Sequence, residues 1–298
     1  MKVYKILLVG VFDFDAENKS TSNSQMIALH NTGHHIRGYN YRIIAEQRGL
    51  EGRDRHLVET IKKYDYDLVI LEKCNQVSFE TFKQISNHTT TCLWFMDPLV
   101  SYNNEMRTKT ALVDYFCCDK ENVLEEAKLI NHNSFHVCEG FDERVDRPQP
   151  AKKEYDVSFI GSVYGKRKDW INRIKHPVKI ISDAYGLQHA LEVSKSKINL
   201  NFCTTNGASD RVYKVLAASG FLLSDDWAGR KSAFEDGKHL VIYDGIDDLN
   251  DKIEFYLSNN DVRNEIAIAG HKEVQKYNRS MWAKKIIRIY KSLKQQKD

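Results

Sequence analysis

Residues 195–244 read KSKINLNFCTTNGASDRVYKVLAASGFLLSDDWAGRKSAFEDGKHLVIYD, and the fold class is clearest in this segment. Apolar and polar residues alternate over 198–202, which is typical of a half-buried strand. A polar loop follows over 204–209, and the periodic segment 211–219 predicts a helix. Residues 221–224 form a short apolar run that fits a buried parallel strand. The stretch therefore predicts the strand, loop, helix and strand of a parallel α/β sheet.

The two ends of the predicted helix carry further signals. Asp210 is expected to be its N-cap, and Gly220 is expected to end it. Arg211 and Lys214 lie on its first turn, where backbone N–H groups and two cations would suit a phosphate or pyrophosphate. The pattern alone fits an ordinary strand–helix–strand unit with a solvated basic turn equally well.

The first half of the chain shows the same alternation of strands and helices. Residues 67–72 are apolar almost without interruption, as in a strand that is buried on both faces. Strands are expected over 6–11, 33–42, 67–72, 91–96, 113–118 and 134–138, and helices over 24–31, 54–63, 79–86 and 121–129. Ligands of such sheets bind at the carboxyl ends of the strands. The carboxylates that fall there are Asp13, Asp15, Glu72, Asp97 and Glu139.

A linker and a second alternation follow. Residues 142–153 hold two of the four prolines and almost nothing apolar. We therefore expect an α/β protein of two doubly wound, Rossmann-like domains that face each other across a cleft. The first domain is expected to span 1–145 and the second 154–280, with a basic C-terminal helix over 281–298 that packs back on the first domain.

Composition excludes several classes of protein. The chain has 298 residues, 42% of them hydrophobic, and no apolar run that is long enough for a membrane span. Its first ten residues read as a strand and not as a signal peptide. The six cysteines lack CxxC spacing, which predicts reduced thiols in a cytoplasmic protein and no zinc site. A net charge of +3 permits an anionic ligand but gives only weak support for nucleic acid.

Several motifs then suggest a family. They are DVSFIGS at 156–162, SKINLN at 196–201 and RVYKVLAASG at 211–220, with WFMDP at 94–98 and EGFD at 139–142 in the first half. Together these motifs resemble the GT-B superfamily of glycosyltransferases, in the group 1 branch that contains spore-maturation-like proteins. The resemblance covers nearly the whole chain. It implies an acceptor-side first domain and a second domain that binds a nucleoside-diphosphate sugar, expected to be UDP-linked.

The resemblance also implies roles for single residues. GT-B sites stabilise the departing diphosphate with cations and helix N-termini and not with a bound metal, and no tightly bound cofactor is expected. The expected donor-binding residues are Gly10, Gly161, Arg167, Tyr185, Asn206, Arg211 and Lys214. Tyr185 would stack on the base. Alternatively, Arg167 belongs to a solvated charge run, and Gly10 is an ordinary strand-end glycine.

Three aspartates are candidates for the acceptor side. Asp97 would orient an acceptor hydroxyl or act as the catalytic base, or it is a turn aspartate that bonds its own backbone before Pro98. Asp13 and Asp15 are alternative bases, or they are solvated loop carboxylates.

One departure from the family bears on mechanism. Many retaining GT-B enzymes carry two glutamates eight positions apart, and Asn206 and Lys214 stand at those positions here. The anomeric outcome is therefore open. The expected activity is that of a hexosyl- or pentosyltransferase, with a non-catalytic GT-B-like nucleotide-sugar-binding protein as the alternative. The acceptor is a glycan, a protein, a small molecule or a hydroxymethylated DNA base, as in phage-type enzymes. Replacing Arg211 by alanine is expected to abolish transfer and to leave the fold intact.

Overall fold

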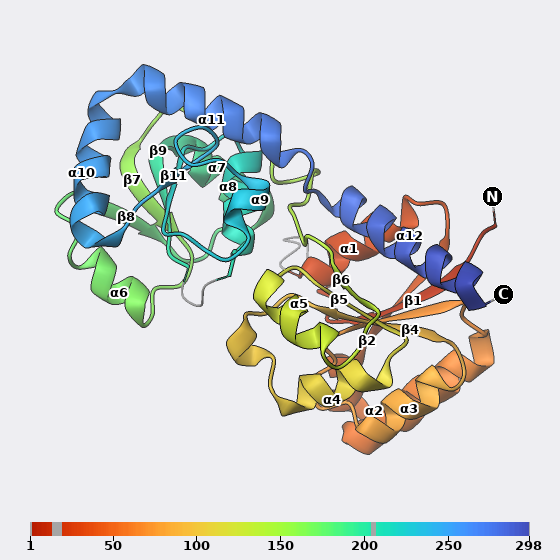
Figure 1. Ribbon diagram of the computed structural model, residues 1–298. Coiled ribbons are helices and arrows are strands. Elements are labelled where there is room, and N and C mark those ends of the chain that lie inside the picture. Colours follow the sequence, from red (N-terminus) through yellow and green to blue (C-terminus); the bar gives the residue numbers. More distant parts are fainter. Residues whose placement is uncertain (1, 14–19, 204–206, 298) are drawn as a thin grey trace. The chain divides into compact units, whose positions relative to one another are not determined.

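The computed structural model describes residues 2–13, 20–203 and 207–297 (Figure 1). Two of the candidate residues, Asp15 and Asn206, lie outside the described residues. The described chain forms two parallel sheets, each with helices along its strands. The α/β fold class that the sequence predicts is therefore confirmed.

The chain divides into two compact units. Unit 1 comprises Met1–Glu139 together with Arg279–Asp298, and unit 2 comprises Gly140–Asn278. The linker expected at 142–153 lies within unit 2 and not between the units. In the part of the chain that is described, no helix combines the length and apolar character of a bilayer span.

Unit 1 is built on a six-stranded parallel sheet in the order β2-β1-β3-β4-β5-β6. Its strands are β1 (Lys5–Gly10), β2 (His35–Asn40), β3 (Leu68–Glu72), β4 (Thr90–Phe95), β5 (Tyr115–Cys118) and β6 (Ser134–His136). Its helices are α1 (Thr21–His30), α2 (Tyr41–Tyr64), α3 (Phe79–Ser86), the 3-10 turn η1 (Leu99–Ser101), α4 (Asn104–Leu112), α5 (Glu121–Lys128) and α12 (Arg279–Lys297).

Both faces of this sheet are buried, which explains the apolar runs in its strands. Leu7 and Val9 of β1 belong to the core under α2 to α5, and Ile6 and Leu8 belong to the core under α1 and α12. α12 lies beside α1 (Figure 1), and its Trp282 ring packs edge-on against Trp94 of β4 with 5.6 Å between centroids. The last helix of the chain thus completes the core of unit 1.

Unit 2 is built on a five-stranded parallel sheet in the order β11-β10-β9-β7-β8. Its strands are β7 (Tyr155–Ile160), β8 (Val178–Ile181), β9 (Ser196–Asn201), β10 (Leu222–Ser224) and β11 (Val241–Ile242). Its helices are α6 (Lys166–Ile171), α7 (Gly186–Lys195), α8 (Asp210–Ala217), α9 (Arg230–Ala233), α10 (Gly245–Ser258) and α11 (Asn260–Val274).

Each sheet has one point where the strand order reverses. In unit 1 the chain runs from β1 outward to β2 and then returns to β3 on the other side of β1. In unit 2 it runs from β7 to β8 and returns to β9 on the other side of β7. Crevices for ligands form at the carboxyl ends of the strands at such points. These ends are at Gly10 and Glu72 in unit 1, and at Ile160 and Asn201 in unit 2.

Some expected boundaries are wrong for local reasons. The strand expected to reach Arg42 ends at Asn40, because the Asn40 side chain accepts a hydrogen bond from the Ile43 N–H and caps α2. α2 is therefore longer than the helix expected at 54–63, and only Gly49 interrupts it, with φ 70°. α4 has no counterpart among the expected helices, since its nine residues bury only Met106, Lys109 and Thr110.

Both expected ends of α8 are also wrong. Ser209 is the N-cap residue, and Asp210 is the first residue of the helix, where its side chain pairs with Lys214. At the other end, Ser219 adopts the left-handed conformation, with φ 59°, and Gly220 does not. Gly220 is required for space instead, since a Cβ there would lie 2.5 Å from the Val193 Cγ1.

Candidate functional site

Arg211 occupies the reversal point of the sheet in unit 2. It lies on the first turn of α8 and is buried, with 9% of its surface exposed. Its Nε donates to the Ile160 carbonyl at 2.6 Å, and its Nη1 donates to the Asn201 Oδ1 at 2.9 Å. The guanidinium thus joins the carboxyl ends of β7 and β9. Burial lowers its pKa to about 10, which leaves it charged at neutral pH.

The backbone at Gly161 exposes the third nitrogen of this side chain. Gly161 has φ 139°, a conformation that side chains disfavour, and a Cβ there would collide with Arg211 Nη2. Among the described residues, no acceptor takes a hydrogen bond from Nη2, and no carboxylate pairs with Arg211. A buried cation therefore presents a free donor at the strand end.

Arg167 is a second buried guanidinium beside Gly161. Its Nη1 donates to the Ser162 carbonyl at 3.1 Å, and its charge contributes to lowering the Arg211 pKa. Its Nε is buried without a partner among the described residues. Both guanidiniums lie over the Phe159 ring, at 4.6 Å for Arg211 and 5.7 Å for Arg167. Two buried cations with unused donors and no carboxylate form a site for an anion.

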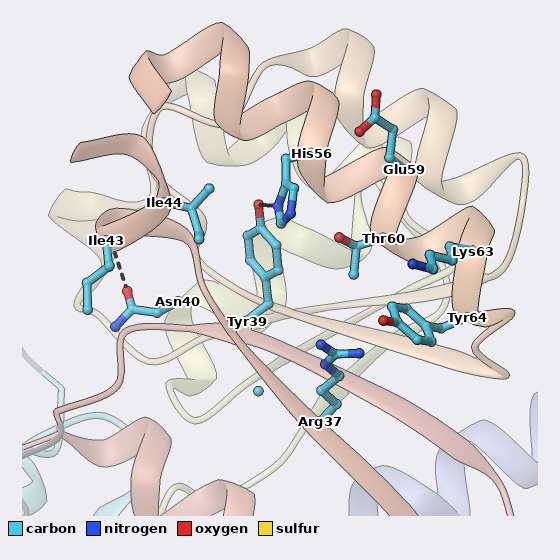
Figure 2. A pocket seen from close by; sticks show the side chains of 11 residues that line it. Arg37, Tyr39, Asn40, Ile43, Ile44, His56, Glu59, Thr60, Lys63 and Tyr64 are labelled. Atoms are coloured by element: carbon cyan, nitrogen blue, oxygen red, sulfur yellow. Dashed lines mark hydrogen bonds between the residues drawn. The ribbon is translucent and has the colours of Figure 1, made fainter. Parts of the chain in front are cut away.

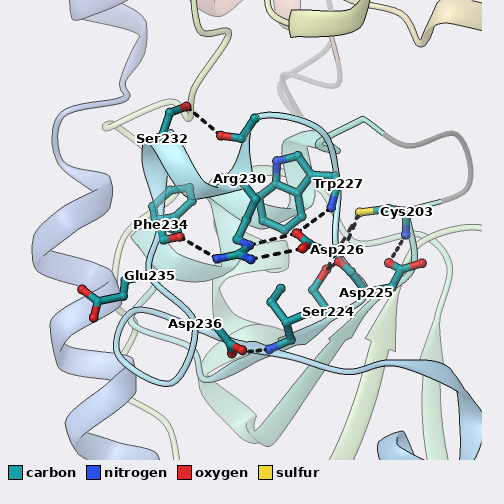
Figure 3. Close-up of polar contacts among 12 residues, drawn as sticks. Cys203, Ser224, Asp225, Asp226, Trp227, Arg230, Ser232, Phe234, Glu235 and Asp236 are labelled. Carbon is teal, nitrogen blue, oxygen red and sulfur yellow. Dashed lines mark hydrogen bonds and ion pairs between the residues drawn. The ribbon is translucent and has the colours of Figure 1, made fainter.

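The loop after β10 is held by the polar contacts drawn in Figure 3. Asp225 accepts from the Cys203 N–H at 2.5 Å and pairs with Lys166 at 3.2 Å. Arg230 forms a two-pronged pair with Asp226, at 2.9 and 3.1 Å, and donates to the Phe234 carbonyl at 3.2 Å. These bonds hold the ends of β9 and β10 in place. Lys166 thus forms an ion pair with Asp225, whereas its neighbour Arg167 pairs with no carboxylate in the described chain.

The remaining donor-side candidates differ in their surroundings. Lys214 pairs with Asp210 at 2.6 Å, so part of its charge is already balanced. Tyr185 precedes α7 and is 44% exposed, as a base-stacking residue must be. His189 of α7 was not expected from the sequence. It is 7% exposed, its Nδ1 has no partner in the described chain, and burial lowers its pKa to about 3. The charges of Lys214 and Arg211 add to this lowering.

In unit 1, the reversal point holds a buried carboxyl group. Glu72 is 4% exposed and lies directly beside Gly10, where a Cβ would collide with its Oε2. Ser22 Oγ donates to Glu72, and the same oxygen accepts from the Val11 N–H at 3.1 Å. Burial raises the pKa of Glu72 to about 7. This carboxyl therefore fixes the segment after β1 to the first turn of α1.

The bonds around Glu72 extend to the core. The Gln25 amide, oriented to satisfy both neighbours, donates to Glu72 and accepts from the Trp94 Nε1 at 2.9 Å. Nearby, the Arg279 guanidinium donates to the backbone carbonyl of Glu139 and lies 3.5 Å from the Glu139 Oε1. The same guanidinium donates to Ser24 Oγ at 3.1 Å. Glu139 and Arg279 are the residues of unit 1 at which the chain leaves and returns. The sequence predicts that Glu72 and Glu139 lie at strand ends, but it does not predict that they are buried or which residues they contact.

Two of the expected acceptor-side aspartates, Asp97 and Asp13, follow strands of this sheet. Asp97 follows β4 and pairs with Lys73 at 2.9 Å, with 34% of its side chain exposed. Asp13 is half-buried, and its carbonyl accepts from the Asn23 amide at 2.7 Å. Asp97 is thus an accessible carboxylate with a fixed direction, as a group that orients a hydroxyl requires.

Comparison with known proteins identifies this architecture. The chain superposes on HepE from Anabaena, solved with UDP-glucose, with a TM-score of 0.72 at 9% identity, covering 97% of this chain and 100% of that one. Sucrose-phosphate synthase from Thermosynechococcus elongatus gives 0.72 at 12% identity, covering 97% and 99%. The chain has the GT-B fold.

Two further comparisons are informative, one with a solved structure over nearly the whole chain and one with a protein family over its second half. An α-glucosyltransferase solved with UDP-glucose and DNA containing an abasic site gives a TM-score of 0.67 at 10% identity, covering 96% of this chain and 98% of that one. Residues 146–287 match the family described as glycosyl transferase-like. None of the curated proteins matches this chain. The family match spans the reversal point of unit 2, where Arg167 and Arg211 lie.

Proposed function

We propose that this protein is a glycosyltransferase that moves a sugar from a nucleoside-diphosphate sugar, expected to be UDP-linked, to a hydroxyl acceptor without a metal ion. The observation that carries the proposal is the pair of buried guanidiniums of Arg211 and Arg167 beside Gly161. Neither pairs with a carboxylate in the described chain, and each keeps an unused N–H donor. A diphosphate supplies the acceptor oxygens and negative charge that these donors lack.

The same geometry accounts for catalysis. When the bond between the sugar and the diphosphate breaks, negative charge develops on the leaving oxygen. The Ile160 carbonyl and Asn201 already hold Arg211 in place, so little reorganisation is required in the transition state. Donors preorganised in this way typically contribute about 100-fold or more to the rate.

The other donor-side residues take supporting roles in this proposal. Lys214 adds charge at the first turn of α8, and Tyr185 stacks on the base. Gly161 and Gly10 allow close approach of backbone to substrate, and Asn206 remains a candidate from the resemblance alone. His189, neutral and buried, offers a ring nitrogen to the donor beside Lys214.

Unit 1 supplies the acceptor-side residues. Asp97 is proposed to orient or deprotonate the acceptor hydroxyl, with Lys73 keeping its carboxylate in place. Asp13 and Asp15 are the alternative bases. The proton of the acceptor hydroxyl then passes to the carboxylate as the sugar is transferred, which balances the reaction.

We also infer finer properties. The motifs at 156–162 and 211–220 support the spore-maturation-like branch and transfer of a hexose or a pentose. The six free cysteines support a reducing compartment and hence a cytoplasmic location.

The experiment combines transfer with matched variants. The protein is incubated with a panel of nucleotide sugars, with and without acceptors, and released nucleoside diphosphate is measured. Arg211→Gln and Arg167→Gln are each expected to lower the rate about 100-fold. Arg173→Gln, at an exposed arginine of the same unit, should leave it unchanged. Arg211→Ala is less suitable, because it strips the Ile160 and Asn201 oxygens of their donor and would also destabilise the fold.

Two results distinguish the alternatives. Binding of a nucleotide sugar without any diphosphate release, whatever the acceptor, would support a non-catalytic nucleotide-sugar-binding protein. Full turnover in both the Arg211→Gln and the Arg167→Gln variant would refute the proposed site.

Among the candidate acceptors, a specific structural feature favours hydroxymethylated DNA. The outer face of α12 exposes Lys284, Lys285 and Arg288, and the helix contains no acidic residue. If DNA is the acceptor, its affinity should fall steeply between 50 and 200 mM salt, as expected for release of counterions from phosphates. A neutral glycan acceptor would show little change.

A further inference from the structure

A pocket of about 460 Å³ lies in unit 1, between β2 and α2 (Figure 2). β2 is the outermost strand of its sheet, so the pocket lies along the edge of the sheet. This volume lies in the range of small-molecule sites. None of the residues assigned above to donor or acceptor contributes to its lining.

The break in α2 gives the pocket two walls. Ile43 and Ile44 come from the segment before Gly49. The segment after it contributes His56, Glu59, Thr60, Lys63 and Tyr64. Gly49 has φ 70° and ψ 171°, a combination that only glycine adopts readily. A straight helix would not place both segments against β2.

One end of the pocket is cationic. The Arg37 guanidinium lies 4.4 Å from the centre of the Tyr64 ring, and the Lys63 amine lies 5.4 Å from it. Both residues are exposed, and neither forms an ion pair with a carboxylate in the described chain. The Glu59 carboxylate points away from both cations in Figure 2. Two convergent, unneutralised cations favour an anionic group.

The middle of the pocket carries polar groups that can form further hydrogen bonds. The Tyr39 hydroxyl donates to the Arg53 carbonyl at 3.2 Å and lies 3.0 Å from His56 Nδ1, which fixes both rings. His56 Nε2 and the Thr60 hydroxyl have no hydrogen-bond partner among the described residues. Both line the pocket and can bond hydroxyl groups of a ligand.

The other end is apolar and close to the acceptor side. Ile43 and Ile44 line it together with Asn40, whose amide donates to the Phe12 carbonyl at 2.8 Å. Asn40 is the register partner of Gly10 across β1 and β2. The pocket thus begins next to the carboxyl end of β1 and runs along β2 to the cations.

We propose that this pocket binds an acidic sugar group, a hydroxyl-bearing ring with a carboxylate or a phosphate. Arg37 and Lys63 bind the acid, His56 and Thr60 bind ring hydroxyls, and the isoleucines cover the apolar face of the ring. Because the pocket lies in unit 1, which the proposed function assigns to the acceptor, the sugar is part of the acceptor. This last step rests on the proposed function, whereas the binding site does not.

Binding is measured on the full chain by NMR titration, without any donor. The probes are glucuronate, glucose 6-phosphate and neutral glucose. We expect the two acidic sugars to bind about tenfold more tightly than glucose, since charge-assisted hydrogen bonds are roughly twice as strong as neutral ones. The two acids identify whether a carboxylate or a phosphate is preferred.

Matched variants locate the binding. Arg37→Gln and Lys63→Gln should each weaken binding of the acidic sugars about tenfold. Lys62→Gln, at an exposed neighbouring lysine that does not line the pocket, should leave it unchanged. Equal binding of glucose, or equal loss in the Lys62→Gln variant, would overturn the proposal. Arg211→Gln should retain acidic-sugar binding even though it lowers the rate of transfer about 100-fold, so the two hypotheses can fail separately.

Discussion

Replacing Glu72 by glutamine should change how the stability of unit 1 depends on pH. Burial raises the pKa of this carboxyl from 4.5 to about 7, so the folded protein binds the proton more tightly than the unfolded chain does. Its contribution to the free energy of unfolding is therefore fully present below about pH 4.5 and is lost as pH rises to about 7. At about 1.4 kcal/mol for each pH unit, the loss is about 3 kcal/mol.

Glutamine keeps the shape of the side chain but does not titrate. It can still accept from Gln25 and donate to Ser22 Oγ. Relative to the wild type, the Glu72→Gln variant should therefore gain about 3 kcal/mol between pH 4.5 and 8, whatever its stability at pH 4.5.

Amide hydrogen exchange of β1 and β3 provides the measurement, because it reports on unit 1 separately from unit 2. Variant and wild type are compared at the same pH, so the intrinsic exchange rate cancels. Glu125→Gln, at an exposed glutamate of α5, is the control and should show no pH-dependent difference. A difference in stability between Glu72→Gln and wild type that stays constant from pH 4.5 to 8 would show that the pKa of Glu72 is not raised by folding.

Three further changes test other contacts. Gly161→Ala places a methyl group against Arg211 Nη2, so calorimetric affinity for a nucleotide sugar should fall about tenfold; unchanged affinity would remove Gly161 from the site. Gly10→Ala places a methyl group against the Glu72 carboxyl and should lower the free energy of unfolding of unit 1 by about 1–3 kcal/mol. Hydrogen exchange measures this loss, and protection equal to that of the wild type would contradict it. Lys73→Gln breaks a partly exposed pair with Asp97, so it should cost under about 1 kcal/mol of stability but alter kcat several-fold; an unaltered kcat would argue against Asp97.

Local pattern was enough to predict most of the fold. The apolar runs at β3 and β4 predict buried parallel strands because both faces of those strands are covered. Helix ends were predicted less well. The N-cap of α8 is Ser209 and not Asp210, and the left-handed residue after the helix is Ser219 and not Gly220, because the backbone angles at these positions depend on the neighbouring turns. α4 was not predicted because only three of its nine residues are buried, so its sequence lacks the apolar pattern of a helix.

The residue types at the strand ends, including Arg211, Arg167, Asp97 and Glu72, can be read from the chain without a structure. Which of these residues are buried, and what they contact, follows from the tertiary fold. The Arg211 side chain meets a carbonyl 51 residues away, and Ser22 meets Glu72 across 50 residues. Burial and partners set the charge and the free donors of each group, and both depend on segments that the fold brings together from distant parts of the chain.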